Sequence, residues 1–406
     1  MPESDLGRRR ERLHPTVRTL GLVSLLNDLA SEMIYPLLPA FVTGVLRGSP
    51  AALGLIEGVA EATASVVKVA SGWLSDRVGQ RKALVVLGYG VSAAVRPLTA
   101  LATAVSHMLA IRVVDRIGKG VRSAPRDALV AAVTPRELRG RAFGFQRAMD
   151  HAGALLGPLV AALLLACGLG LRPLFALAAL PGLLTVIVLV VAVRDAPPVR
   201  PTEPAPADAS PPPPRSRGYR RYLAVLALFT LGNSSDAFLL LRAQQVGLSL
   251  AAIPLLWAFH HAVKSAASTW GGALSDRIGR RRAIQAGWIV YALAYLGFAL
   301  ATRPIHVWLL FALYSLYFAL SEGAERALVA DLTHVSTRGR SFGLYHAVPG
   351  IALLPASLLT GLLWQRFGAP VALGTGATLA AIAGLLLFVV PESPRATEQK
   401  GTALPA

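Results

Sequence analysis

Residues 72–83, GWLSDRVGQRKA, occur a second time, slightly changed, two hundred residues later in the chain. The second copy, GALSDRIGRRRA at residues 272–283, aligns without a gap, and eight of the twelve positions are identical. ALVAAVTPRELRGRAFG at residues 128–144 likewise matches ALVADLTHVSTRGRSFG at residues 327–343, at an offset of 199 with ten identities in seventeen. Two matches at nearly the same offset indicate that the chain contains one structural unit twice.

The segments around these repeats are strongly apolar. The chain has 406 residues, of which 54% are hydrophobic and only 15% charged. Apolar runs recur along its whole length, and a helix of about 20 residues crosses a hydrocarbon layer about 30 Å thick. This pattern predicts an all-α integral membrane protein. Its twelve transmembrane helices are expected near residues 16–46, 51–75, 82–104, 107–132, 140–166, 172–193, 220–246, 250–275, 282–302, 306–332, 339–365 and 369–391.

The positive charges predict the orientation of these helices. The formal net charge is +18, and the basic residues cluster in the N-terminal tail and in alternate links. The opposite links contain only Arg47, Arg172, Arg303 and Arg366. By the positive-inside rule, both termini are expected in the cytoplasm, and a nucleic-acid partner is not. The single cysteine, Cys167, excludes a disulfide framework, and the basic N-terminal tail is interpreted as retained rather than cleaved.

A proline-rich segment divides the predicted helices into two sets of six. It is too rich in proline to form a helix, so a flexible cytoplasmic linker is expected at residues 194–219. The predicted parts are a tail (1–15), a six-helix bundle (16–193), the linker, a second six-helix bundle (220–391) and a final tail (392–406). Two bundles related as parallel repeats are typical of transporters that rock around a midplane site.

The repeated loop resembles the G-x-x-x-D-R-x-G-R-K/R loop of the major facilitator superfamily. Both copies fall where that family has the loop, between helices two and three and between helices eight and nine. The resemblance implies a secondary transporter with a cytoplasmic gate, in which Asp76 pairs with arginines at neighbouring helix ends. Alternatively, Arg77, Arg81 and Lys82 only set the topology. The predicted gate residues are Gly72, Asp76, Arg77, Gly79, Arg81, Arg126, Asp127, Gly272, Asp276 and Arg277.

A second signature lies in the fifth predicted helix, in GFQRAMDHAGALLGP at residues 144–158. Gly144, Gly153, Gly157 and Pro158 resemble the antiporter motif of the export branch of the same superfamily. Glycines four residues apart allow two helices to approach closely in lipid, and the proline bends its helix. The alternative is ordinary helix packing. The eleventh predicted helix does not repeat this pattern.

The fourth predicted helix contains RVVDRIGKGVRSAPRD at residues 112–127. At about 100° per residue, its charged side chains share one face. A charge facing lipid at mid-depth costs about 3 kcal/mol, so this face is expected to look into the bundle or into water. The outer part is predicted to line a substrate cavity, and an internal ion-pair scaffold is the alternative. These cavity candidates are Arg112, Asp115, Arg116 and Lys119.

Other ionisable residues within the predicted helices are candidates for proton coupling. Asp28 and Glu32 lie four apart and therefore share a face of the first helix. Glu32 ranks first because a weak repeat alignment places Asp236 opposite it. The further proton candidates are Glu57, Glu61 and Asp150, and the further cavity candidates are Arg147, Asp236, His261 and Glu322.

These residues predict a proton-coupled antiporter that exports a small organic solute or drug by alternating access. No nucleotide-binding loop or nucleophile motif occurs, so neither an enzyme nor a cofactor is expected, and the energy must come from an ion gradient. The protein is expected to act as a monomer in the bacterial inner membrane. Three alternatives remain: uptake of a small solute, such as an anion, by proton symport; metal-ion export; and a non-transporting membrane sensor or scaffold.

Overall fold

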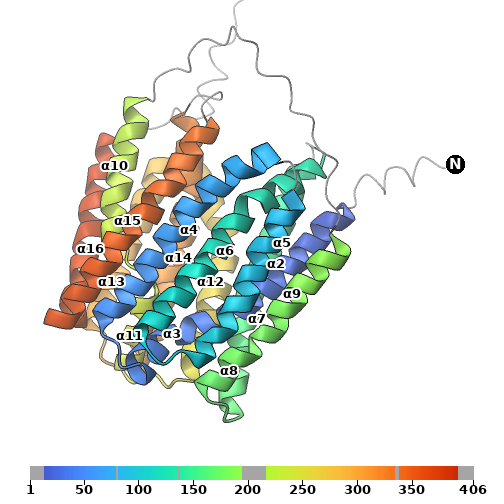
Figure 1. Cartoon of the computed structure of the whole chain (residues 1–406). Coiled ribbons are helices and arrows are strands. Elements are labelled where there is room, and N and C mark those ends of the chain that lie inside the picture. The colour runs from blue at the N-terminus through green and yellow to red at the C-terminus, as the bar shows by residue number, and fades with distance from the viewer. Residues whose placement is uncertain (1–12, 79–80, 136–137, 194–215, 334–337, 392–406) are drawn as a thin grey trace, which may run out of the picture. The chain divides into compact units, whose positions relative to one another are not determined.

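The computed structural model describes residues 13–78, 81–135, 138–193, 216–333 and 338–391, and in these ranges the chain is helical without any strand (Figure 1). The predicted linker and both tails lie almost entirely outside them. Gly79 also lies outside the described residues, as do the side chains of Asp76, Arg77 and Asp276, and nothing is described for Gly272 beyond its place in a helix. The predicted gate pairing of Asp76 therefore stays a prediction.

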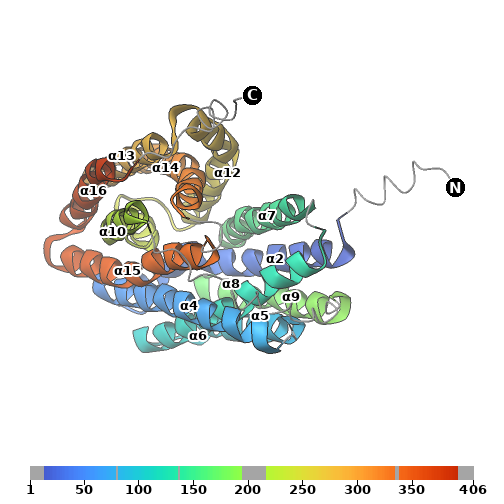
Figure 2. The ribbon, with the colours of Figure 1, turned by 90° about the horizontal axis from the view of Figure 1, so that it is seen from above.

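The chain forms two compact units, and the first consists of Met1–Leu38 and Thr63–Ala205. Its main contacts pair α2 with α7 and α5 with α6, and α9 packs against α2 and α5; Figure 2 shows α2 beside α7. The elements are α2 (Pro15–Ile34), η1 (Tyr35–Leu37), the later part of α4 (Pro50–Val78), α5 (Arg81–Val95), η3 (Arg96–Leu101), α6 (Val105–Ala132), α7 (Arg139–Ala166), α8 (Leu171–Leu177) and α9 (Ala179–Ala192).

The second unit consists of Pro39–Ala62 and Pro206–Ala406. In it, α13 packs against α14 and α16, α12 against α14, and α10 against α15 and α16. The elements are α3 (Leu38–Ala40), η2 (Phe41–Val45), the first part of α4, α10 (Arg217–Gly232), α11 (Ala237–Gln245), α12 (Ala252–Ile278), α13 (Arg280–Leu300), α14 (Pro304–Asp331), α15 (Arg338–Phe367), α16 (Ala369–Leu386) and η6 (Leu387–Val389).

The second copy of the repeated loop shows why a glycine is needed there. Gly279 separates α12 from α13 and has a φ of 99°, a left-handed conformation that other residues rarely adopt. The chain can therefore end one helix and begin the next within a single residue.

Residues 39–62 group with the second unit, whereas the sequence assigns them to the first bundle. Gly54 and Gly58 explain this grouping, because they bring α4 against the backbone of α15 at Ser357 and Leu354. A Cβ atom on Gly58 would lie only 3.0 Å from the Cα of Leu354. The predicted bundle limits, 16–193 and 220–391, remain predictions.

Eight helical segments of the described residues are long and apolar enough to cross a membrane, judged by length and composition. Helices α2, α4, α6 and α12 occupy the other ranges predicted to span, and they contain many of the ionisable side chains described below. The structure is thus that of an all-helical, multi-pass membrane protein.

Candidate functional site

Asp115 of α6 is the centre of a buried charge cluster in the first unit. Arg96 approaches one carboxylate oxygen at 2.8 Å, and Arg112 and Arg116 approach the other at 4.0 and 3.9 Å. All four side chains are less than 10% exposed. Arg96 also donates to the backbone and side-chain oxygens of Asn27 on α2, at 3.1 and 2.9 Å. Predicted cavity residues are therefore joined here in an internal ion-pair cluster.

About two turns after Asp115, α6 contacts α5 through Arg122. Arg122 donates to the hydroxyl of Ser92 at 2.8 Å, and its guanidinium lies 4.4 Å from the ring centre of Tyr89. The two helices can approach this closely because Gly88 and Gly118 face each other. A Cβ atom on Gly88 would lie 2.6 Å from the carbonyl oxygen of Gly118. Helix packing through glycine thus places the polar side chains of α5 and α6 in contact.

Ser24 of α2 joins α6 to α7. Its hydroxyl accepts hydrogen bonds from Arg126 at 3.2 Å and from Gln146 at 2.8 Å. Arg126 also lies 3.0 Å from Asp127 and 3.8 Å from Asp150. Arg147, which is largely exposed, approaches the other oxygen of Asp150 at 3.8 Å. Asp150 is thus a mostly buried carboxylate between two arginines.

Two of the predicted antiporter-motif glycines pack onto the turn of α2 that contains Asp28 and Glu32. A Cβ atom on Gly157 would lie 2.7 Å from the carbonyl oxygen of Leu29 and 2.9 Å from the Cβ of Glu32. A Cβ atom on Gly153 would lie 3.0 Å from the Cβ of Asp28. Pro158 is buried beside them, whereas Gly144 has no atom within 4 Å of such a position.

The second unit holds its acidic residues by different contacts. Asp236 accepts a hydrogen bond from the hydroxyl of Tyr314 at 2.5 Å. The hydroxyl of the preceding residue, Ser235, donates to the buried carboxylate of Glu57 at 3.4 Å. Glu322, nearly half exposed, lies 2.6 Å from Arg326 and 3.8 Å from Lys264.

Glu325 is a buried carboxylate held by neutral donors. It accepts hydrogen bonds from the indole of Trp288 at 3.1 Å and from the hydroxyl of Tyr345 at 2.9 Å. The rings of α13 and α14 form a cluster nearby, in which Tyr291 lies 5.1 Å from Tyr317 and 5.9 Å from Tyr314 between ring centres. Aromatic contacts therefore dominate in the second unit where arginines dominate in the first.

The other predicted residues occupy varied places. Glu61, Lys119 and His261 are half-buried on α4, α6 and α12. Arg81 donates to the carbonyl of Ala128 at 3.5 Å, which places this gate candidate beside α6. Arg277, also a gate candidate, is exposed. Among the described residues, no group of three or more His, Cys, Asp or Glu side chains could hold a metal ion.

Several polar partners in the structure were not predicted from the sequence. Their signals were weak, because a lone serine, asparagine or aromatic residue in an apolar helix is usually ordinary packing. Only the tyrosines of α14, spaced three residues apart, form a recognisable stripe. The missed partners are Asn27, Ser92, Trp288, Tyr314 and Tyr345.

An all-helical membrane fold with ionisable side chains buried inside both units is typical of a membrane transporter. The family model of the Major Facilitator Superfamily matches residues 20–321 and 225–405, and the chain belongs to that family. Its members are transporters and not enzymes.

Individual relatives agree with this assignment. An uncharacterised MFS-type transporter of Methanocaldococcus jannaschii is 36% identical over 395 residues, which cover 93% of this chain and 95% of the relative. The puromycin resistance protein of Streptomyces alboniger is 38% identical over only 112 residues, 25% of this chain and 22% of that protein. The crystal structure of a D-xylose–proton symporter shares the fold, with a TM-score of 0.75 at 17% identity over 93% of this chain and 98% of that one.

Proposed function

We propose that the protein is a proton-coupled antiporter that exports a small organic solute by alternating access. It acts as a monomer with twelve spans in two parallel six-helix bundles, and both termini lie in the cytoplasm at the bacterial inner membrane. One observation supports the proposal above the others. The hydroxyl of Ser24 on α2 joins Arg126 of α6 to Gln146 of α7, and Arg126 pairs with Asp150 of α7, so that a polar network lies inside a membrane-spanning unit. Charges in that setting are costly and generally serve function.

Matching packing contacts in the two units support the repeat. Gly88 of α5 faces the carbonyl of Gly118 and the Cβ of Arg122 on α6. Gly287 of α13 faces the carbonyl of Tyr317 and the Cβ of Ser321 on α14. Each residue of the second set stands 199 positions after its counterpart, the same offset as the sequence match at residues 128–144.

The coupling step is assigned to the α2 carboxylates. Asp28 and Glu32 lie where Gly153 and Gly157 hold α7 against α2, one to two turns from Ser24. A shift between the two helices therefore changes the surroundings of both carboxylates directly. In this scheme, a carboxylate takes a proton in one state of the transporter and releases it in the other, in exchange for the solute. Asp150, between Arg126 and Arg147, is the second candidate.

Export is favoured over uptake by two features. The glycines that resemble the antiporter motif make the close helix contact that such a motif requires. A partial relative, aligned over 25% of this chain, is named for resistance to puromycin. The excess of arginine over carboxylate around Asp115 favours a solute with an anionic group.

Transport by purified protein in proteoliposomes tests the proposal. An inward proton gradient is imposed, and the flux of puromycin and of a panel of organic anions is measured in both directions. Solute movement opposite to the proton, abolished by a protonophore, is expected. Movement in the same direction as the proton would establish symport instead. Gradient-driven flux of Mn²⁺ or Zn²⁺ alone would support metal export, and no flux of any compound would support a sensor or scaffold.

A further inference from the structure

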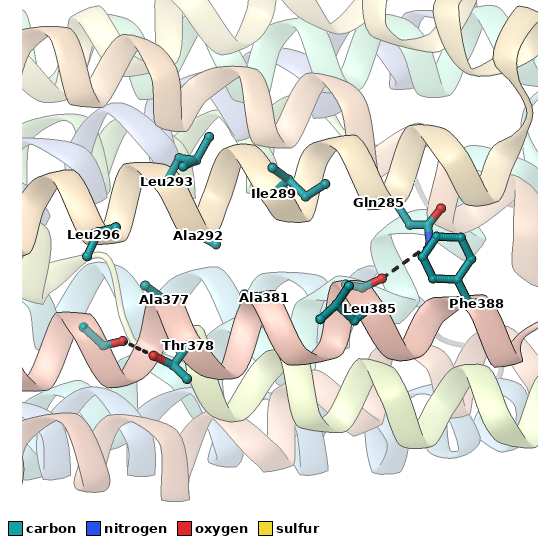
Figure 3. A pocket seen from close by; sticks show the side chains of 12 residues that line it. Gln285, Ile289, Ala292, Leu293, Leu296, Ala377, Thr378, Ala381, Leu385 and Phe388 are labelled. Carbon is teal, nitrogen blue, oxygen red and sulfur yellow. Dashed lines mark hydrogen bonds between the residues drawn. The ribbon is translucent and has the colours of Figure 1, made fainter.

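An apolar groove lies on the surface of the second unit between α13 and α16 (Figure 3). Its volume is about 480 Å³. Small residues such as Ala292 and Ala377 form the floor, and larger side chains such as Leu293 and Leu385 line it. Leu293 is 55% exposed and Leu385 is 68% exposed, so the groove opens away from the core of its unit. In a membrane protein, such a surface faces lipid.

The polar atoms in the groove are directed at the helices rather than at an occupant. Gln285 donates to the carbonyl of Gly384 at 3.4 Å, and Thr378 donates to the carbonyl of Gly374 at 2.9 Å (Figure 3). The remaining lining residues are hydrocarbon or aromatic. The groove therefore fits a featureless apolar chain better than a solute or protein surface that needs polar partners.

One end of the groove meets a cluster of arginines. Gln285 and Phe388 lie together at that end in Figure 3, close to the first turn of α13. Arg281 donates to the carbonyl of Val390 at 3.0 Å, and its guanidinium lies 5.6 Å from the ring centre of Phe388. Arg221 of α10 donates to the carbonyl of Val389 at 3.4 Å. The basic cluster is the name used here for Arg221, Arg281 and the exposed Arg282.

We propose that the groove binds one acyl chain of an anionic phospholipid, with the lipid headgroup on the basic cluster. The positive-inside rule assigns the basic cluster to the cytoplasmic surface, so the lipid comes from the cytoplasmic leaflet. The proposal rests on that orientation but not on the direction or coupling of transport. The length of the groove also fits an acyl chain. Gln285 and Leu296 lie about 16 Å apart along the helix, and the hydrocarbon layer of one leaflet is about 15 Å thick.

Charge decides which lipid is favoured. Basic pockets between membrane helices on the cytoplasmic side attract anionic headgroups. The N-terminal end of α13 adds the positive end of the helix dipole at the same place. A zwitterionic lipid would gain the apolar contacts alone, so phosphatidylglycerol should bind more tightly than phosphatidylcholine.

Native mass spectrometry of the full-length protein tests this proposal. The protein is reconstituted into nanodiscs of phosphatidylcholine with a minor share of phosphatidylglycerol, released, and examined for retained lipid. Wild type should retain one phosphatidylglycerol, enriched over its share in the nanodisc. Ala381→Trp, which fills the groove, should lose it, whereas Ala176→Trp at an exposed position of α8 should not. If Ala381→Trp does not fold, Ala381→Leu takes its place.

A second pair of variants tests the headgroup contact. Arg282→Gln should lower the preference for phosphatidylglycerol about fivefold, the effect of one basic residue near a surface. Arg303→Gln, an exposed arginine beyond the opposite end of α13, should leave it unchanged. Equal retention of both lipids by wild type would overturn the proposal, as would equal retention by the two tryptophan variants. A dimer lost only in Ala381→Trp would identify a second copy of the chain as the occupant instead.

Discussion

The helix pair α5–α6 of the first unit and the pair α13–α14 of the second pack alike but differ in chemistry. Residues 199 positions apart make the same close contacts, Gly88 with Gly118 and Gly287 with Tyr317. Arg96 and Asp115 form an ion pair at 2.8 Å. The residues 199 positions later are Tyr295 and Tyr314, two rings whose centres lie 6.2 Å apart.

The comparison shows which of these residues the helix packing requires: the close backbone contacts are common to both pairs, and the buried charges are not. The second pair reaches the same arrangement with aromatic rings, so buried charges are not needed to bring these two helices together. Burying an ion pair is costly and is often no more stabilising than an apolar contact of similar size. The charges of the first unit therefore call for another reason, and the proposed exchange of an ionic solute against protons supplies one.

Asp115→Asn should have the largest effect on stability. It leaves Arg96, Arg112 and Arg116 buried around a neutral side chain, and breaking a buried pair in this way costs about 3–5 kcal/mol. Thermal unfolding in detergent should show a clearly lowered midpoint. Adding Arg96→Gln should restore part of the loss, because the two residues are coupled. An unchanged unfolding midpoint in Asp115→Asn would show that the charge of Asp115 does not stabilise the buried arginines.

Gly157→Leu should have the next largest effect on stability. The new side chain would meet the backbone of α2 at Leu29, and overpacking of this kind costs about 1–3 kcal/mol. Transport should fall strongly, since α7 can no longer lie against the turn with Asp28 and Glu32. Gly90→Leu in α5, outside the motif, is the matched control, because a Cβ atom there would have no other atom within 4 Å. Equal flux in the two variants, measured in proteoliposomes, would remove the reason to treat Gly157 as part of a motif.

Tyr314→Phe should have a smaller effect. It removes the hydrogen bond to Asp236 but keeps the ring in its cluster, so a loss of about 1 kcal/mol is expected from thermal unfolding. Tyr295→Phe is the control, because the hydroxyl of Tyr295 donates only a long hydrogen bond of 3.5 Å to the carbonyl of Ser234. A loss as large as that of Asp115→Asn would mean that the two units depend equally on polar contacts.

Asp76→Asn should leave stability nearly unchanged and lower the transport rate, because the gate is expected to act in one conformational state only. Asp276→Asn tests the second copy of the loop in the same assay. Wild-type flux in Asp76→Asn, with normal insertion into the membrane, would contradict the gate. Equal reductions of the transport rate by the two substitutions would show that both loops act as gates.

The sequence predicts the helical segments because long apolar runs and their charged links are local features, but it does not predict that the α-helix ends at Ile34 and at Gly232 inside two expected spans. It also predicts the close packing of Gly153 and Gly157, which follows from their spacing. It does not show that Asp115 pairs with Arg96, because side-chain partners on different helices depend on how those helices pack. Gly54 and Gly58 have the same four-residue spacing, and their contact with α15 was open to the same reasoning but was not predicted.

Proton-driven transport by variants of α2 tests the central claim most directly. Glu32→Gln and Asp28→Asn, singly and together, are reconstituted with wild type, and uphill solute movement on an imposed pH gradient is measured. We expect the double variant to exchange solute down its own gradient but to lose uphill transport, while its thermal stability stays close to wild type. Undiminished uphill transport by the double variant would contradict the assignment of proton coupling to α2.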